Sequence, residues 1–190
     1  MRLTLQLLAA AILVTQLPAC IPVIAGGAAA TGVMVADRRT SGTYIEDQEI
    51  ELKARQALSE QLGDNVHASV TSFNRNVLLT GEAFNEESKA KAEALVKNVI
   101  NVRNVINEMV VAPTSSMTAR SNDTYITSKV KARIVADHQF PANYVKVVTE
   151  RSVVYLMGLV TQQEAEQAVE IASSTDGVEK VVKVFEYIEE

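Results

Sequence analysis

Tryptophan is absent from the 190-residue sequence, aromatic residues make up 5% of it, and Cys20 is the only cysteine. A single thiol cannot form an intramolecular disulfide, so this cysteine needs another role. The formal net charge of −5 argues against general nucleic-acid binding, which requires a basic surface that displaces phosphate counterions. The 47% apolar content is ordinary for a folded chain and argues against wholesale disorder.

Motifs of catalysis and metal binding are missing as well. The sequence has no nucleophile elbow, P-loop or dinucleotide fingerprint. His67 and His138 lie in different halves of the chain, and neither has neighbours at metal-ligand spacing. Acidic pairs such as Glu86-Glu87 are typical of solvated helix faces. We therefore expect a protein that is not an enzyme, with no catalytic residue, metal site or cofactor.

The first nineteen residues have the pattern of a secretory signal peptide. Arg2 is followed by an apolar run, residues 3–17, that is too short and too interrupted to span a bilayer, which takes ~20 apolar residues. The stretch ends in Leu17-Pro18-Ala19-Cys20, which resembles a lipobox, in which the cysteine is diacylated on sulfur and becomes the acylated N-terminus. We expect lipidation of Cys20, and the alternative is an unmodified cysteine behind an ordinary signal peptide. Ile21 in place of Asp after the cysteine favours sorting to the outer membrane of a Gram-negative cell.

Residues 20–45 are predicted to form the lipidated N-terminus and a tether. Residues 21–36 are small and apolar, with three glycines and no charge. Such a stretch is too short and too poor in helix formers for a transmembrane helix. A tether between the lipid and the folded part of the chain is the better interpretation.

From about residue 46 the sequence repeats itself once. The clearest match pairs residues 76–81 (NVLLTG) with residues 152–158 (SVVYLMG), each a β-type run that ends in glycine. A further alternating run precedes each of them, at 67–71 and 145–149, and before those runs apolar residues recur four apart, as in helices. A second helix and a last β run, at 102–107 and 178–183, complete each unit. Each unit therefore reads helix, strand, strand, helix, strand.

Capping residues support these boundaries. Asn122 or Asp123 is expected to cap the helix that begins near Thr124, because its side-chain oxygen can accept an unpaired backbone N–H. Asn85 and Thr161 are expected to do the same for the second helices, and Thr161 with Glu164 forms a capping box. After these helices, Gly177 and its counterpart Asn101 are residue types that tolerate a left-handed backbone.

The pattern resembles the BON domain, whose last strand opens with a Gly-Val-x-x-Val segment. The second unit carries it as Gly177-Val178-Glu179-Lys180-Val181, and the first carries residues 101–105 with Asn in place of Gly. We expect an α+β fold of two αββαβ domains, each a three-stranded mixed sheet covered on one face by two helices. The boundaries are BON domain 1 at 46–112, a polar linker at 113–122 and BON domain 2 at 123–190.

Two such domains behind a lipobox are similar to the dual-BON outer-membrane lipoproteins. The resemblance implies a periplasmic, lipid-anchored protein that binds anionic phospholipid, phosphatidylglycerol or cardiolipin, through the first helix of its second domain. It also implies a role in outer-membrane integrity, with enrichment at division sites.

The helix predicted at 124–137 fits that role by its own pattern. Ile126, Val130 and Ile134 fall on one face and are expected to pack in the core. The other face combines an aromatic residue with a polar tip, small or apolar residues and lysines at its edges, which suits a bilayer interface. The expected lipid-binding residues are Tyr125, Ser128, Lys129, Lys131, Ala132 and Val135.

The first domain serves as an internal control. Its equivalent helix, predicted at 46–60, has Glu49 where the second has Tyr125. Its net charge is −3, whereas residues 123–136 carry +2. Two alternatives remain: the Tyr125 face could pack against the first domain, or the protein could be an adaptor for outer-membrane assembly or cell-wall remodelling proteins that uses exposed sheet edges or the acidic first domain.

Overall fold

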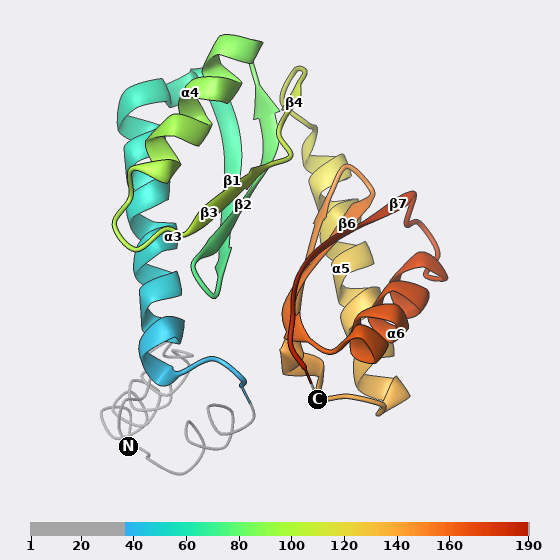
Figure 1. Ribbon diagram of the computed structural model, residues 1–190. Coiled ribbons are helices and arrows are strands. Elements are labelled where there is room, and N and C mark those ends of the chain that lie inside the picture. Colours follow the sequence, from blue (N-terminus) through green and yellow to red (C-terminus); the bar gives the residue numbers. More distant parts are fainter. Residues whose placement is uncertain (1–36, 190) are drawn as a thin grey trace, which may run out of the picture. The chain divides into compact units, whose positions relative to one another are not determined.

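The computed structural model describes residues 37–189. The expected signal peptide, the lipidation site at Cys20 and tether residues 20–36 lie outside the described residues. In the described part the helix–strand–strand–helix–strand unit occurs twice, as the repeat in the sequence predicts (Figure 1). No helix in residues 37–189 is long and apolar enough to cross a membrane.

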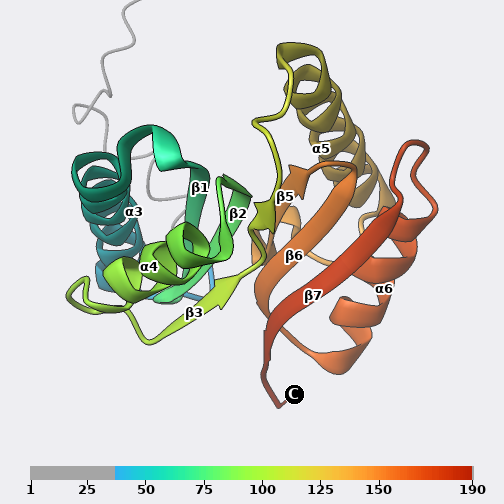
Figure 2. The ribbon, with the colours of Figure 1, turned by 90° about the horizontal axis from the view of Figure 1, so that it is seen from above.

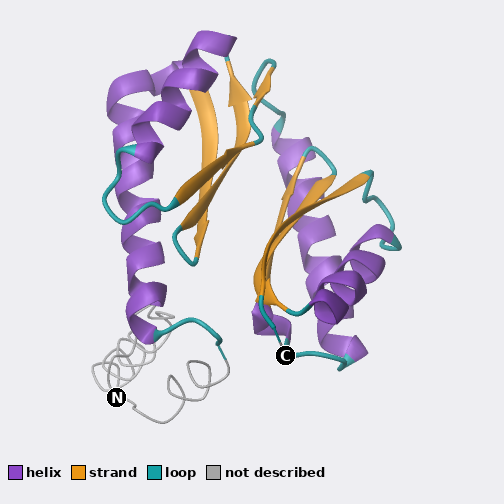
Figure 3. Cartoon of the chain, in the orientation of Figure 1, coloured by secondary structure: helices purple, strands orange, loops and turns teal. Residues whose placement is uncertain are grey.

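The first repeat forms a mixed sheet with two helices on one face (Figures 1 and 3). Strand β2 pairs antiparallel with β1 and parallel with β3 and β4. The last strand of this repeat consists of two pieces, β3 and β4. Between them the chain leaves the strand geometry, and the side chain of Met109 is buried in the core. The elements are α3 (Ser41–Leu62), the short helix η2 (Gly63–Asn65), β1 (Val66–Phe73), β2 (Asn76–Ala83), α4 (Glu86–Lys97), β3 (Asn104–Asn107) and β4 (Val110–Val111).

The second repeat has the same order with an unbroken last strand. Strand β6 pairs antiparallel with β5 and parallel with β7, and both helices cover one face of this sheet (Figure 2). The predicted α+β fold class and the mixed sheets are confirmed, although the first sheet has four strands because its last strand is divided into β3 and β4. The elements are α5 (Met117–Asp137), η3 (Ala142–Tyr144), β5 (Val145–Glu150), β6 (Val153–Val160), α6 (Gln162–Ser173) and β7 (Lys180–Tyr187).

Each repeat has its own core between its sheet and its helices. On the first helices, Ile50, Ala54, Leu58 and Leu62 are buried in one core, and Ile126, Val130 and Ile134 are buried in the other, as their spacing predicts. Every second residue of β2, including Val77 and Leu79, faces the core of the first repeat, because the side chains of a strand alternate between its two faces.

The first helices begin earlier than the sequence analysis predicted. Helix α3 starts at Ser41, within the predicted tether, with Thr40 as its N-cap. Helix α5 starts at Met117, within the predicted linker, with the Ser116 side chain accepting from the backbone N–H of Ala119. The expected cap at Asn122 or Asp123 is therefore wrong, because the residues before Thr124 already belong to the helix.

Asp123 has a different task, and Asp47 performs it in the first repeat. Each aspartate is buried on its helix and accepts hydrogen bonds from two consecutive backbone N–H groups in the turn of its own hairpin. These turn residues, Asn74-Arg75 and Arg151-Ser152, all have positive φ angles. A turn of this kind exposes its backbone N–H groups, so a buried carboxylate stabilises a backbone that few side chains favour.

The caps of the second helices agree with the sequence. Asn85 accepts from the N–H of Ser88, and Thr161 with Glu164 forms the complete capping box. Gly177 and Asn101 have the expected positive φ angles, 91° and 69°. They lie beyond the helix ends rather than at them, because α6 and α4 end at Ser173 and Lys97.

Candidate functional site: the outer face of helix α5

Helix α5 presents a face without charged residues that is longer than the predicted site. Because a helix turns about 100° per residue, seven positions from Met117 to Val135 fall within a sector of about 100°. All seven side chains are exposed, including Met117 (71%), Tyr125 (62%) and Val135 (56%). We call this surface the α5 outer face; its residues are Met117, Ser121, Thr124, Tyr125, Ser128, Ala132 and Val135.

Four of the predicted lipid-binding residues, Tyr125, Ser128, Ala132 and Val135, lie together on this face. The sequence analysis missed Met117, Ser121 and Thr124 because it began the helix too late. Ser116 as an N-cap, followed by small or apolar residues at helical spacing, was the signal that would have found them.

The hydroxyl groups of the α5 outer face are satisfied by the helix itself. Ser121, Thr124 and Ser128 each donate a 2.9 Å hydrogen bond to the carbonyl oxygen four residues earlier. This arrangement occupies the hydroxyl proton, so that burial of the side chain leaves no unpaired donor. The face is therefore less polar than its side-chain types indicate.

The two predicted lysines differ in their contacts. Lys129 donates to the backbone carbonyl of Asp176 and lies over the Tyr125 ring, with its Nζ 4.9 Å from the ring centroid. Lys131 is exposed on the opposite border of the face, and no ion pair or hydrogen bond of its ammonium is found among the described residues. Of the two predicted lysines, Lys131 therefore has the more accessible ammonium, whereas that of Lys129 is engaged beside Tyr125.

The first repeat does not cover the α5 outer face. The two repeats meet through the sheet faces that their helices leave open, where Phe73 and Leu78 cluster with Tyr155 and Met157. Ion pairs surround this cluster, including Lys146 with Glu51 at 2.8 Å. The alternative in which Tyr125 packs against the first domain is therefore wrong, because the apolar contact between the repeats uses the sheets.

A family model for the BON domain matches the chain twice, at residues 46–113 and 122–189. The chain belongs to the BON-domain family. It is similar to outer membrane lipoprotein DolP of Haemophilus influenzae, with 38% identity over 91% of both chains. Identity is 31% to a 21 kDa hemolysin of Actinobacillus pleuropneumoniae over 80% of both chains, and 32% to osmotically-inducible protein Y of Escherichia coli over 74% of this chain and 72% of that protein.

The equivalent surface of the first BON domain differs mainly in charge. Asp47 and Asp123 have the same role, so Glu49 on α3 stands where Tyr125 stands on α5. Lys53 pairs with Glu49 at 2.6 Å, and Arg55 pairs with Glu51 at 2.7 Å. Both cations that border this face are thus neutralised within their own helix. The face is not wholly polar, however: Ile45 and Leu52 are 62% and 66% exposed.

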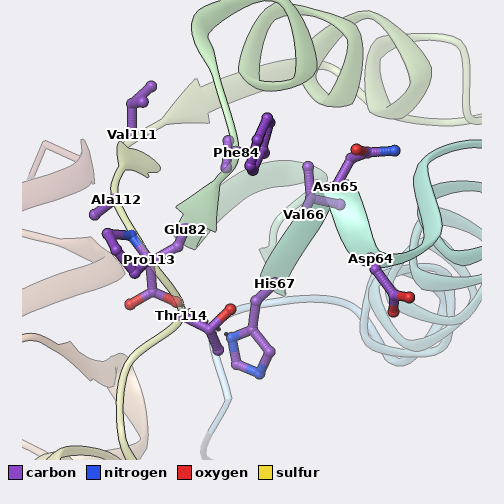
Figure 4. A pocket seen from close by; sticks show the side chains of 11 residues that line it. Asp64, Asn65, Val66, His67, Glu82, Phe84, Val111, Ala112, Pro113 and Thr114 are labelled. Carbon is purple, nitrogen blue, oxygen red and sulfur yellow. Dashed lines mark ion pairs between the residues drawn. The ribbon is translucent and has the colours of Figure 1, made fainter.

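A second candidate site lies at the far end of the first BON sheet. A cavity of about 440 Å³ is lined by Phe84 and Val111 on its apolar side and by His67 and Glu82 on its polar side (Figure 4). The buried Glu82 carboxylate is 3.4 Å from His67 Nδ1 and 3.3 Å from Arg151 Nη1. The sequence analysis did not identify Glu82. This residue is charged, although it lies on the sheet face that the helices leave open, where an apolar residue is expected.

The chemistry of this cavity is that of a polar network around a buried carboxylate, in which Arg151 is the ion-pair partner of Glu82. His67 Nε2 lies 3.0 Å from Arg120 Nη1, so both ring nitrogens have polar neighbours. No nucleophile is hydrogen-bonded to the imidazole among the described residues, and no group of three potential metal ligands occurs in them. The arrangement explains His67 as a partner of buried charge, and His138 as the left-handed C-cap of α5.

Proposed function

We propose that this chain is a lipid-anchored outer-membrane lipoprotein on the periplasmic side, whose second BON domain binds anionic phospholipid through the α5 outer face. It acts as a binding protein that supports outer-membrane integrity at division sites, and not as an enzyme. The proposal rests on the accessible Tyr125 side chain within an uncharged helix face, bordered by a cation. The similarity to the lipoprotein DolP supports the location.

The contacts of the face fit a headgroup region. Tyrosine suits this depth because its ring is apolar and its hydroxyl reaches water. Lys131 gains about 1 kcal/mol near an anionic surface. Acylation of Cys20 keeps the domain at high effective concentration near the bilayer, so weak affinity for the headgroups of phosphatidylglycerol or cardiolipin is sufficient.

A titration with phosphatidylglycerol micelles, followed residue by residue by NMR, tests the lipid contact. The described unit should show shift changes along α5, and Tyr125→Glu should abolish them while the rest of the spectrum keeps its dispersion. Tyr187→Glu is the matched control, because that tyrosine is 52% exposed on strand β7, away from the face. Unchanged shift perturbation in Tyr125→Glu rejects the proposal.

The alternative function is an adaptor for outer-membrane assembly or cell-wall remodelling proteins. The exposed apolar side chains of the first BON domain support it, above all Phe84, which is 76% exposed beside the cavity of Figure 4. A photo-crosslinker at 84 or within residues 46–60 that traps one protein, together with an absence of lipid-induced shifts, would favour the adaptor.

A further inference from the structure

Two consecutive arginines precede the first helix and extend to different repeats. Arg39 contacts the first repeat: its guanidinium is 2.8 Å from the Asp47 carboxylate and 4.0 Å from the centre of the Phe73 ring. Arg38 contacts the second repeat: it donates two hydrogen bonds, 2.6 and 2.8 Å long, to the Glu164 carboxylate. Residues 37–40 therefore join both halves directly before α3.

The contacts of Arg38 are those of a specific bidentate site. A third hydrogen bond, 2.8 Å long, goes to the carbonyl of Leu159, and the guanidinium lies 3.8 Å from the centre of the Tyr144 ring. Glu164 also accepts from the N–H of Thr161 in the capping box, so the carboxylate is fixed before the arginine binds. A planar guanidinium between a ring and a fixed carboxylate holds one orientation.

The electrostatics agree with this geometry. The Glu164 hydrogen bonds raise the pKa of Arg38 despite some burial. Burial opposes ionisation of Glu164, but the hydrogen bonds from Arg38 and Thr161 outweigh it, and the pKa of Glu164 is lowered. The side chain of Arg39 is only 7% exposed and forms ion pairs with Asp37 and Asp47. Both arginines are therefore held as charged, partnered groups.

The two repeats are joined at opposite ends of their sheets. The covalent connection follows β4 at one end, where the ion pair between Arg151 and Glu82 also lies. Arg38 binds at the other end, to the carbonyl of Leu159 in the last part of β6 and to Glu164 just beyond that strand. Without Arg38, that side would still have the apolar contact and the pair of Lys146 with Glu51 at 2.8 Å. It would also keep the hydrogen bonds that Glu186 accepts from Asn74 and Asn76, and the exposed pair of Glu186 with Arg103 at 3.3 Å. None of these contacts involves the end of the tether.

We propose that Arg38 and Arg39 are positioning residues: together they lock the two repeats and the end of the tether into one body, so that the α5 outer face keeps one orientation relative to the point where the tether enters the fold. The orientation part rests on the proposed function, whereas the locking of the repeats does not. A protein with a freely hinged second repeat would present α5 to the membrane only part of the time.

Distances between spin labels in the full lipidated chain test the locking. Nitroxides at Gln56→Cys on α3 and Ser173→Cys on α6 report the separation of the repeats, because Cys20 is the only native cysteine and is acylated in this proposal. We expect one narrow distance peak for the parent chain and a broad distribution for Arg38→Gln. Arg38→Lys keeps the charge without the bidentate geometry and should give an intermediate width.

Arg103→Gln is the matched control, because it removes an ion pair between the repeats whose side chains are 52% and 30% exposed. It should leave the peak narrow. An equally narrow peak in Arg38→Gln, at the parental distance, would overturn the proposal. Arg39 is left unchanged here, since its loss would leave the buried Asp47 carboxylate short of a partner and could unfold the first repeat.

A single label at Ala132→Cys tests the orientation in phosphatidylglycerol-containing vesicles. In the parent background the label should be relaxed more by lipid-soluble oxygen than by a water-soluble nickel chelate, and Arg38→Gln should lose this preference. If the preference survives in Arg38→Gln, the orienting role is rejected. If the parent chain itself shows no preference, the proposed function fails, and the distance measurement still decides the locking.

Discussion

The first helices of the two BON domains share one scaffold and differ in what they offer outward. Each buries an aspartate that holds a hairpin turn, and each has cations at the borders of its outer face. On α3 those cations are paired with Glu49 and Glu51, whereas on α5 Lys131 is unengaged and Tyr125 occupies the equivalent of Glu49. The two copies thus differ in one respect: the cations of α3 are paired within their helix, whereas α5 has an exposed uncharged face with Lys131 at its border.

Removal of the shared aspartates should have the largest effect. Asp47→Ala should lower the free energy of unfolding by about 4 kcal/mol, because the carboxylate also pairs with Arg39 and accepts from Ser72. Asp123→Ala should cost about 2 kcal/mol, since only the two turn N–H groups lose their acceptor. Urea unfolding of the two variants measures both values. Equal losses would show that the extra partners of Asp47 contribute nothing.

The turns before the last strands should show a smaller difference. Gly177→Ala should cost about 2 kcal/mol, because φ is 91° and the new Cβ would lie 3.3 Å from the Ile126 side chain. Asn101→Ala in the first domain should cost about 1 kcal/mol, from the left-handed backbone alone. Thermal unfolding of both variants checks this order. A smaller loss of stability in Gly177→Ala than in Asn101→Ala would mean that the Ile126 side chain moves away from the new methyl group.

The lysines beside the α5 outer face should differ in lipid binding. Lys131→Gln should weaken partitioning onto phosphatidylglycerol vesicles about fivefold at low salt. Lys129→Gln should have a smaller effect, because that ammonium already bonds to the Asp176 carbonyl. Vesicle co-sedimentation measures both, and Lys53→Gln on α3 is the matched control. The reverse order would show that Lys129 leaves Asp176 to meet phosphate.

A pH effect centred on Glu150 of the second domain should be small, because the carboxyl is only half-buried and solvent screening reduces its contribution to stability. Burial, with the nearby charges of Glu82 and Asp123, raises the pKa of Glu150 from 4.5 to about 7, whereas the equivalent residue in the first domain is the uncharged Phe73. The folded state therefore binds more protons than the unfolded state between these values, and stability should fall as pH rises from about 4.5 to about 7.

Glu150→Gln should remove this part of the pH dependence of stability and leave the dependence above pH 7 unchanged. Urea midpoints at half-unit pH steps, parent minus variant, provide the measurement. A difference that rises with pH across this range would contradict the assigned direction.

The fold was predictable because local patterns and the duplication pointed to the same answer. Ile50 to Leu62 and Ile126 to Ile134 show helical spacing, and the alternation around Leu79 and Leu156 shows strands, so each copy supported the interpretation of the other. The helix starts were missed, because Ser116 and Thr40 are no stronger as caps by residue type than Asp123, and only the residues at helical spacing after Ser116 distinguish it. Asp123 is a good cap by residue type, but its carboxylate accepts a hydrogen bond from the backbone of a turn 28 residues away.

The site was partly predictable for the same reason. Helical spacing placed Tyr125, Ala132 and Val135 on one face, but only three-dimensional contacts show that the apolar contact between the domains uses the sheets and not this face. The engagement of Lys129 by Asp176 and the contacts of Arg38 involve partners 47 and 126 residues away. Such long-range pairs leave no periodic trace in a single sequence.

The bonded hydroxyls of α5 have a bearing on how similar helices are recognised. A hydropathy scale counts Ser121, Thr124 and Ser128 as free alcohols, although each proton is held by its own backbone. Mean hydropathy therefore understates the apolar character of this helix face. A scale that counts a serine or threonine as less polar when its hydroxyl donates to the carbonyl four residues earlier would correct this.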